Sequence, residues 1–140
     1  MVEVFKSMPE TTFIWKYEEK DSEIVQHLKN VYLSEWVPQN ALLADPRLTV
    51  FINNGGLGSI TELAYMGKPA VLIPIFVDQT RNANMFAKHG GGVVSKKEDL
   101  KHPKKLKDLL QKIFSDDRLK RCHLSNSLLS VVFYVDPAAA

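Results

Sequence analysis

Short apolar runs alternate with amphipathic segments along this chain. Runs rich in β-branched and aromatic residues predict strands, and they occupy residues 11–17, 31–34, 50–53, 70–74 and the segment starting at Val93. Between them, apolar residues at helical spacing predict helices over residues 40–44, 60–66, 80–88, 106–113 and 119–129, and the end of a helix around residues 4–8. Because strands alternate with helices, we expect an α/β fold, with a parallel sheet flanked by helices.

The centre of this pattern is a strand that runs into a glycine-rich turn. Val50-Phe51-Ile52-Asn53 is followed by Asn54-Gly55-Gly56-Leu57-Gly58-Ser59 and then by a helical segment. A strand, a glycine turn and a helix in this order direct backbone N–H groups and the positive end of the helix dipole at an anion. Ligands of parallel sheets bind at the carboxyl ends of the strands. The motif therefore predicts a phosphate site at that edge, although any tight turn can use glycine.

The composition of the chain excludes several classes of function. With 140 residues, 45% of them hydrophobic, the chain is expected to form a single domain over residues 1–140. A net charge of +2 gives no basic surface for nucleic acid, so no nucleic-acid partner is expected. One cysteine and four histidines without ligand spacing predict no metal site. No stretch has the ~20 apolar residues of a membrane span.

Two further blocks accompany the glycine turn and suggest a family. Trp36-Val37-Pro38-Gln39 lies upstream, and Pro74-Ile75-Phe76-Val77-Asp78-Gln79 lies downstream. In this order the three blocks resemble the nucleotide-sugar signature of the UDP-glycosyltransferases, the glucuronosyl- and glucosyltransferases. The residues of these blocks are most similar to those of the animal, nematode-like branch. The resemblance implies a Rossmann-like domain, the C-terminal half of a GT-B fold.

The same resemblance implies a reaction. A hexose would move from a UDP-sugar, UDP-glucuronic acid or UDP-glucose, to a small lipophilic acceptor with inversion at the anomeric carbon. The UDP-sugar is the donor substrate, and no cofactor or metal is implied. A complete member of the family would lie at the endoplasmic reticulum membrane, although this chain carries no membrane segment.

The resemblance also assigns residues to the uridine. Trp36 would stack on uracil, whereas composition alone favours a tryptophan in the core. The backbone of Val37 would read the uracil edge, Gln39 would lie near the ribose, and the Glu62 carboxylate would hold the ribose hydroxyls. Glu62 could equally be a charge that complements the helix dipole.

The diphosphate and the sugar would meet the remaining candidates. Gly56, Gly58 and Ser59 would line the diphosphate, next to Asn54, where the family commonly has a histidine. Asparagine can donate a hydrogen bond but cannot become cationic, so we expect weaker donor binding. Asp78 and Gln79 would hold the sugar hydroxyls, and Asp78 could also cap the following helix. Arg81 and Asn82 are expected to support this loop.

Some parts that the resemblance implies are not in this sequence. The catalytic base of the family comes from an amino-terminal half, so we expect no catalytic residue in this chain. A leading strand should precede Val4, and without it we expect an unpaired sheet edge. Residues 130–140 do not follow the family pattern and are expected to form a tail.

Two alternatives remain open. The chain could be a non-catalytic UDP-binding or interaction fragment. It could also be a dinucleotide-binding oxidoreductase domain, although Gly56-x-Gly58-x-x-Thr61 lacks the third glycine of that motif.

Overall fold

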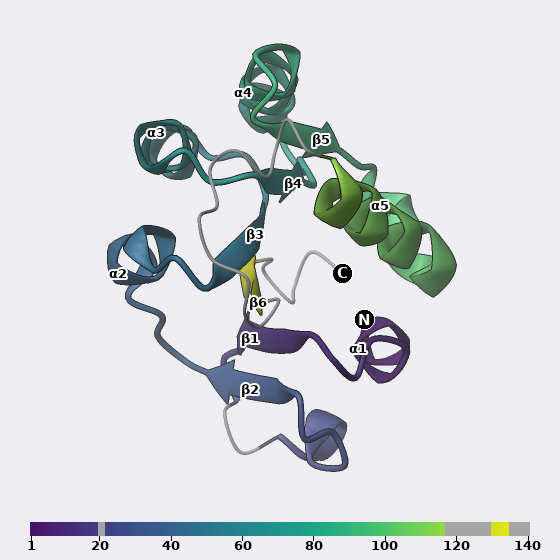
Figure 1. The fold of residues 1–140 in the computed structure, drawn as a ribbon. Helices are drawn as coiled ribbons and strands as arrows, with labels where there is room; N and C mark the ends of the chain where they lie inside the picture. Colours follow the sequence, from purple (N-terminus) through teal and green to yellow (C-terminus); the bar gives the residue numbers. More distant parts are fainter. Residues whose placement is uncertain (20–21, 117–129, 135–140) are drawn as a thin grey trace.

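In the part of the chain that the structure describes, six parallel strands form a single sheet at the centre of the molecule (Figure 1). The structure is a computed structural model, and it describes residues 1–19, 22–116 and 130–134. The strand order is β2-β1-β6-β3-β4-β5, and every neighbouring pair is parallel. The strands are β1 (Thr12–Lys16), β2 (Val31–Ser34), β3 (Leu48–Asn53), β4 (Ala70–Leu72), β5 (Gly92–Val94) and β6 (Ser130–Tyr134).

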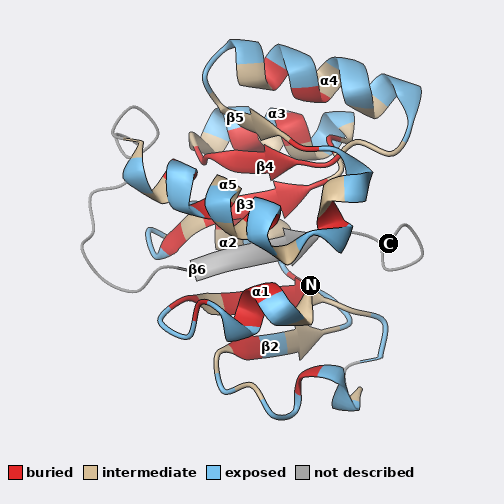
Figure 2. Ribbon diagram, turned by 90° about the vertical axis from the view of Figure 1, so that its right-hand side faces the viewer, coloured by how far each residue is buried: buried red, intermediate tan, exposed pale blue. Residues whose placement is uncertain are grey.

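Helices cover both faces of the sheet, which confirms the predicted α/β class. Helices α1 (Val2–Lys6) and α5 (Pro103–Ser115) lie on one face, and α2 (Gln39–Ala44), α3 (Leu57–Met66) and α4 (Val77–Lys88) lie on the other. Two short 3₁₀ helices, η1 (Glu23–Val25) and η2 (Lys97–Lys101), join the elements. Figure 2 shows that the helices turn their exposed positions outward while β3 and β4 are buried.

Alternate residues of β3 supply the two hydrophobic cores. Val50 and Ile52 pack under α1 and α5, whereas Phe51 packs under α2, α3 and α4. Successive side chains of a strand point to opposite faces, so a strand buried on both faces must be apolar almost throughout. This is why residues 50–52 form a continuous apolar run rather than an alternating one.

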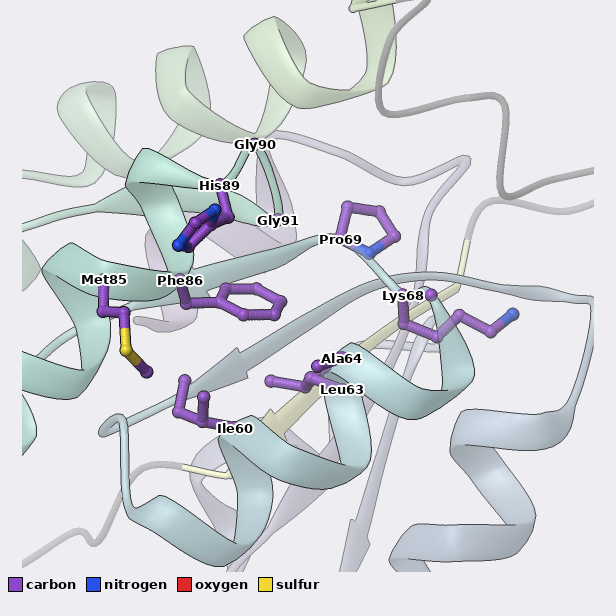
Figure 3. Close-up of a pocket in the computed structure, with 11 residues that line it drawn as sticks. Ile60, Leu63, Ala64, Lys68, Pro69, Met85, Phe86, His89, Gly90 and Gly91 are labelled. Atoms are coloured by element: carbon purple, nitrogen blue, oxygen red, sulfur yellow. The ribbon is translucent and has the colours of Figure 1, made fainter.

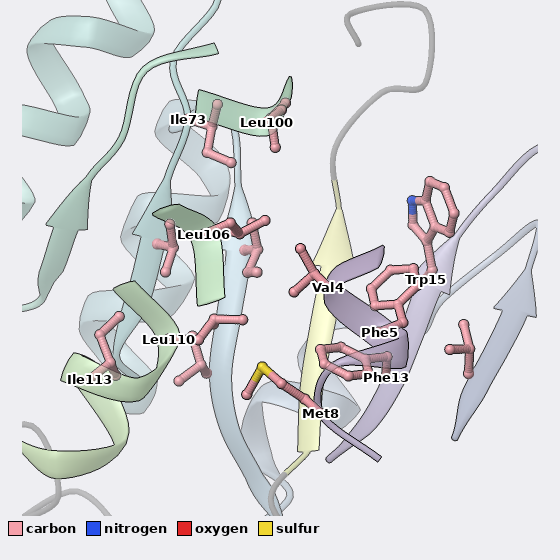
Figure 4. Packing of buried hydrophobic residues seen from close by; sticks show 14 of the residues in the cluster. Val4, Phe5, Met8, Phe13, Trp15, Ile73, Leu100, Leu106, Leu110 and Ile113 are labelled. Atoms are coloured by element: carbon pink, nitrogen blue, oxygen red, sulfur yellow. The ribbon is translucent and has the colours of Figure 1, made fainter. Parts of the chain in front are cut away.

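Trp15 belongs to the first of these cores. It is 7% exposed, and its ring lies 5.5 Å from the ring of Phe5 and 4.8 Å from that of Tyr17. Phe5 in turn lies 4.6 Å from Phe13. Figure 4 shows Phe5, Phe13 and Trp15 in the same cluster as Leu106 and Leu110 of α5, and this packing joins α1 to the sheet.

Strand β6 contradicts the expectation of an unpaired edge. It lies between β1 and β3, the place that the first strand takes in the doubly wound order 3-2-1-4-5-6. Residues 130–134, expected in a tail, are therefore a central strand. Apolar β-branched residues such as Val131 and Val132 suit such a place, but the pairing is too distant in sequence for local patterns to reveal.

The starts of several helices also differ from the prediction. Helix α3 begins at Leu57 rather than at residue 60, and α4 begins at Val77 rather than at residue 80. In both cases the first turn contains polar or glycine residues, which hide the helical period. The helix predicted over residues 119–129 lies outside the described residues.

Candidate functional site

The candidate residues come together at the carboxyl edge of the sheet. Trp36 follows β2, Asn54 follows β3, and Asp78 lies beyond β4, while Gln39 and Ser59 lie in the first turns of α2 and α3. Parallel strands end at the same edge, so segments that are far apart in the sequence meet there (Figure 1).

The glycine turn is held from three sides. The Gly55 N–H donates to Asn53 Oδ1 at 2.8 Å, and Asn82 Nδ2 donates to the Gly55 carbonyl at 3.3 Å. Gly55 has a φ of 87°, and a Cβ there would lie 3.0 Å from the backbone oxygen of Gln79. Only glycine fits this position without strain. Asn82 thus holds the glycine turn, whereas the sequence predicts that it supports the loop of Asp78 and Gln79.

The start of α3 is open to a ligand. Gly56 is the N-cap residue, and no side chain caps the helix. A Cβ at Gly56 or Gly58 would meet nothing within 4 Å, so free space lies beside both residues. The first N–H groups of a helix have no partner within it and attract anions. This corner therefore has the geometry of an anion site.

Gln39, Ser59 and Glu62 form a hydrogen-bonded group beside that corner. Gln39 Nε2 donates to Glu62 Oε2 in a short hydrogen bond and lies 3.3 Å from Ser59 Oγ. Asn53 Nδ2 lies 3.4 Å from the same hydroxyl. These contacts join α2, β3 and α3, and the bond from Gln39 fixes the Glu62 carboxylate. The resemblance places Gln39 and Glu62 near the same ribose, but the direct hydrogen bond between them was not predicted.

Trp36 is not a core residue. It is 76% exposed, and its carbonyl accepts a hydrogen bond from Ser34 Oγ at 2.6 Å. The next residue, Val37, is 4% exposed and anchors the loop in the second core. An exposed indole held next to a buried anchor offers a flat surface to a planar ligand.

Asp78 and Gln79 lie in the first turn of α4. The interpretation of Asp78 as the N-cap is wrong, because α4 begins at Val77 and its N-cap residue is Phe76. Gln79 Oε1 accepts hydrogen bonds from the N–H groups of Ile75 and Phe76, at 2.9 and 3.2 Å. The Gln79 side chain thus shapes the loop before α4, and its amide NH₂ group carries the remaining donor capacity.

Asn54 carries an unsatisfied polar atom. Its Oδ1 is buried and has no hydrogen-bond partner, whereas most buried polar atoms have one. Burying a carbonyl oxygen without a donor costs about 1–3 kcal/mol. Among the candidate residues of the described chain, Asn54 is therefore the one that has a buried side-chain oxygen without a hydrogen-bond donor.

A separate cavity lies between α3 and α4. It has a volume of about 420 Å³, and Ile60, Leu63, Met85, Phe86 and His89 are among the residues that line it (Figure 3). Gly67, Pro69 and Gly91, which precede β4 and β5, also line it. The cavity is therefore at the amino ends of these strands, and it contains none of the candidate residues.

Among residues 1–19, 22–116 and 130–134, no helix could cross a membrane. Within the same ranges, no group of three His, Cys, Asp or Glu side chains could hold a metal ion.

Known proteins share this sequence pattern and this fold. The family model described as "UDP-glucoronosyl and UDP-glucosyl transferase" matches residues 2–133. The chain is 32% identical over 131 residues to the nematode protein ugt-47 of Caenorhabditis briggsae, covering 90% of this chain and 24% of that one. It is 32% identical over 127 residues to UDP-glucuronosyltransferase 3A1 of Xenopus laevis, covering 89% of this chain and 24% of that one. The chain thus spans about a quarter of the length of these relatives.

Solved structures agree with this result. A glycotransferase of kitacinnamycin matches with a TM-score of 0.74 and 28% identity, over 86% of this chain and 31% of that one. The glycosyltransferase VinC, solved with DTDP, shares the fold with a TM-score of 0.61 over 84% of this chain and 37% of that one. The fold is the Rossmann-like α/β domain of GT-B glycosyltransferases, and the chain belongs to the UDP-glycosyltransferase family.

Proposed function

We propose that this chain binds the UDP part of a UDP-sugar at the carboxyl edge of the sheet. The observation that carries the proposal is the group formed by Gln39, Ser59 and Glu62 beside the open start of α3. It combines a fixed carboxylate with free helix N–H groups, which suits a ligand that has both hydroxyls and phosphates.

Each part of UDP has a matching group. The Glu62 carboxylate accepts hydrogen bonds from the two ribose hydroxyls, and Gln39 holds it in place. The first N–H groups of α3, at Gly58 and Ser59, donate to the diphosphate. The exposed Trp36 ring stacks on uracil, and the backbone of Val37 reads its edge.

The sugar is held from α4. The Asp78 carboxylate accepts from sugar hydroxyls, and the Gln79 NH₂ group donates to them because its Oε1 is already engaged by Ile75 and Phe76. Asp78 and Gln79 stay next to the glycine turn because Gly55 packs against the backbone of Gln79 and bonds to Asn82.

We infer that the complete protein is an inverting hexosyltransferase, which transfers glucuronic acid or glucose to a small lipophilic acceptor. The departing UDP is stabilised by the donors at the start of α3. The exposed side chains of Leu57, Phe76 and Val77 border the same edge and suit a lipophilic acceptor. The general base comes from a part of the protein beyond these residues.

A second candidate function has a specific observation in its favour. This chain spans about a quarter of the relatives' length, so it could act as a non-catalytic UDP-binding fragment. The dinucleotide-binding oxidoreductase alternative is replaced by membership of the glycosyltransferase family.

Calorimetry with UDP and NAD tests the binding proposal. We expect UDP to bind more tightly than NAD, and Glu62→Gln to weaken UDP while affecting the 2′,3′-dideoxy analogue less. Tighter binding of NAD, or equal losses for both uridine ligands, would contradict the assigned role of Glu62.

A further inference from the structure

The cavity between α3 and α4 lies apart from the proposed UDP site and has the size of a small-molecule site. Its apolar walls include Ile60 and Leu63 of α3 and Phe86 of α4, and all three side chains are buried. Met85 also lines the cavity and is 48% exposed, so a ligand can reach it from solvent. The volume is about 420 Å³. Sites for small molecules measure ~300–1,000 Å³ and are mostly apolar.

Small residues keep this space open. Ala64 and Gly67 line it from the α3 side, and Gly90 and Gly91 line it after α4. A Cβ at Gly90 would meet nothing within 4 Å, whereas a Cβ at Gly91 would lie 2.4 Å from the Phe86 ring. The ring therefore rests directly on the backbone of Gly91, which fixes this wall of the cavity. Protein interiors are otherwise close-packed, so a preformed space of this size between two helices calls for an occupant.

Several polar groups of the walls are already hydrogen-bonded within the protein. The N–H groups of Gly90 and Gly91 donate to the carbonyls of Ala87 and Phe86, at 2.9 and 3.0 Å. Lys68 Nζ donates to two backbone carbonyls at the connection from α2 to β3, and Figure 3 shows its amino group pointing away from Phe86. The charge of Lys68 is thus directed elsewhere, so an uncharged and mainly apolar ligand fits the cavity best.

Three side chains define the chemistry of this ligand further. Figure 3 shows Met85 and Phe86 extending from α4 towards α3, and both a thioether and an aromatic ring make favourable contacts with aromatic ligands. His89 lines the same cavity, and its imidazole has no hydrogen-bond partner among the residues that the structure describes. We propose that the cavity binds a small uncharged aromatic molecule with one hydroxyl group. The ring lies against Met85 and Phe86, and the hydroxyl donates to a ring nitrogen of His89.

An NMR titration of the methyl-labelled protein with 2-naphthol, in the absence of UDP, tests the proposal independently of the proposed function. We expect saturable shifts of the methyl groups of Ile60, Leu63 and Met85. Shifts confined to Leu57 and Val77, at the carboxyl edge of the sheet, would contradict the proposal. Shifts that depend on protein concentration but not on 2-naphthol would also overturn it, because they would indicate an interface between copies.

Two tryptophan substitutions test the location of the ligand. Ala64→Trp fills the cavity from an exposed position of α3, and it should weaken 2-naphthol by about tenfold or more because the buried apolar contact is lost. Tyr65→Trp is the matched control, since Tyr65 is the next residue of α3, is 86% exposed and does not line the cavity. Equal affinities of the two variants for 2-naphthol would contradict the proposal.

His89→Phe tests the hydrogen bond and keeps an aromatic ring at this exposed position. The unchanged protein should bind 2-naphthol about fivefold more tightly than 2-methoxynaphthalene, which lacks the hydroxyl proton, because one hydrogen bond has about this effect. The His89→Phe variant should bind the two compounds equally. A preference for 2-naphthol that persists in this variant would overturn the assigned role of His89, and this comparison does not depend on the folding of the Ala64→Trp variant.

Discussion

Two tryptophans show how position decides the use of a side chain. Trp15 alternates with Phe13 and Tyr17 on a strand, and it is buried in the first core. Trp36 comes just after a strand, where the chain turns, and it is 76% exposed. Exposing a large aromatic side chain forgoes the free energy of burying it, so an exposed ring at a ligand edge suggests binding.

We expect Trp36→Ala to weaken UDP binding about tenfold or more, since stacking of a base on an aromatic side chain is worth ~1–3 kcal/mol. Calorimetry measures the effect. Tyr65→Ala is the matched control, because Tyr65 is 86% exposed but lies near the far end of α3. Equal affinities of the Trp36→Ala variant and the unchanged protein would show that the indole is not a base platform.

Asn54 leads to a second prediction at this scale. Its buried Oδ1 lacks a partner, and its amide cannot carry the positive charge of a histidine. We expect Asn54→His to strengthen UDP binding, most at low pH where the imidazole is charged. Affinities measured from about pH 5 to 8 test this, with Asn84→His on the exposed surface of α4 as the control. If affinity does not change across that range, position 54 does not face the diphosphate.

The Asp45–Arg47 pair predicts a response to acid. Hydrogen bonds from the Arg47 guanidinium and N–H lower the pKa of Asp45 from 3.8 to about 2. A carboxylate with a lowered pKa in the folded state stabilises the protein above its ordinary pKa and loses that effect as the pH falls towards 2.

We therefore expect Arg47→Met to lower the urea midpoint slightly at pH 7 and to have a smaller effect at each step from about pH 4 towards pH 2. The effect is small because the Arg47 side chain is mostly exposed. Salt should reduce it further. A difference in midpoint that stays constant across this pH range would contradict the linkage to Asp45.

Among the elements, the connection from α2 to β3 depends on a buried lysine. Lys68, just after α3, is 5% exposed, and its Nζ donates to the carbonyls of Asp45 and Leu48 at 2.8 and 3.1 Å. These two carbonyls flank the loop between α2 and β3. The lysine thus fixes α2, which carries Gln39, relative to α3, which carries Glu62.

We expect Lys68→Met to lower the free energy of unfolding by about 1–3 kcal/mol, because two carbonyl groups lose a charged donor. Chemical denaturation measures this, and Lys104→Met at an exposed position of α5 is the control. An equal effect of the two substitutions would show that the Lys68 hydrogen bonds contribute nothing.

The elements also show what the sequence could reveal. The five strands before β6 were predicted in their order, because β-branched and aromatic runs such as 50–53 are local signals. The starts of α3 and α4 were placed a turn too late, because Gly58 and Asp78 interrupt the apolar period. The hydrogen bond between Gln39 and Glu62 depends on how α2 packs on α3, which no local pattern encodes.

For the whole molecule, the main difference between the predicted and the observed fold is the position of β6 in the sheet. A parallel sheet from alternating strands and helices was predictable, but the insertion of the last strand between the first and third depends on pairing across the whole chain. The three sequence blocks converge at one edge for a simpler reason, because all of them follow parallel strands.

The described site has donor-binding candidates but no base opposite them. A general base must lie within ~2.6–3.2 Å of the hydroxyl that it deprotonates, and Asp78 is proposed to hold the sugar. We therefore expect the purified chain to transfer no sugar from UDP-glucuronic acid or UDP-glucose to a panel of phenols. Mass spectrometry would detect a glycoside, and formation above background that Asp78→Ala abolishes would make the chain a self-sufficient enzyme.

The most direct test of UDP binding at the start of α3 is an NMR titration of the isotopically labelled protein with UDP, in which the amide and indole resonances are followed. We expect saturable shifts at Gly56, Gly58, Ser59 and the Trp36 indole, with NAD producing weaker ones at equal concentration. Shifts confined to the cavity between α3 and α4, or no saturable shift at the start of α3, would contradict it.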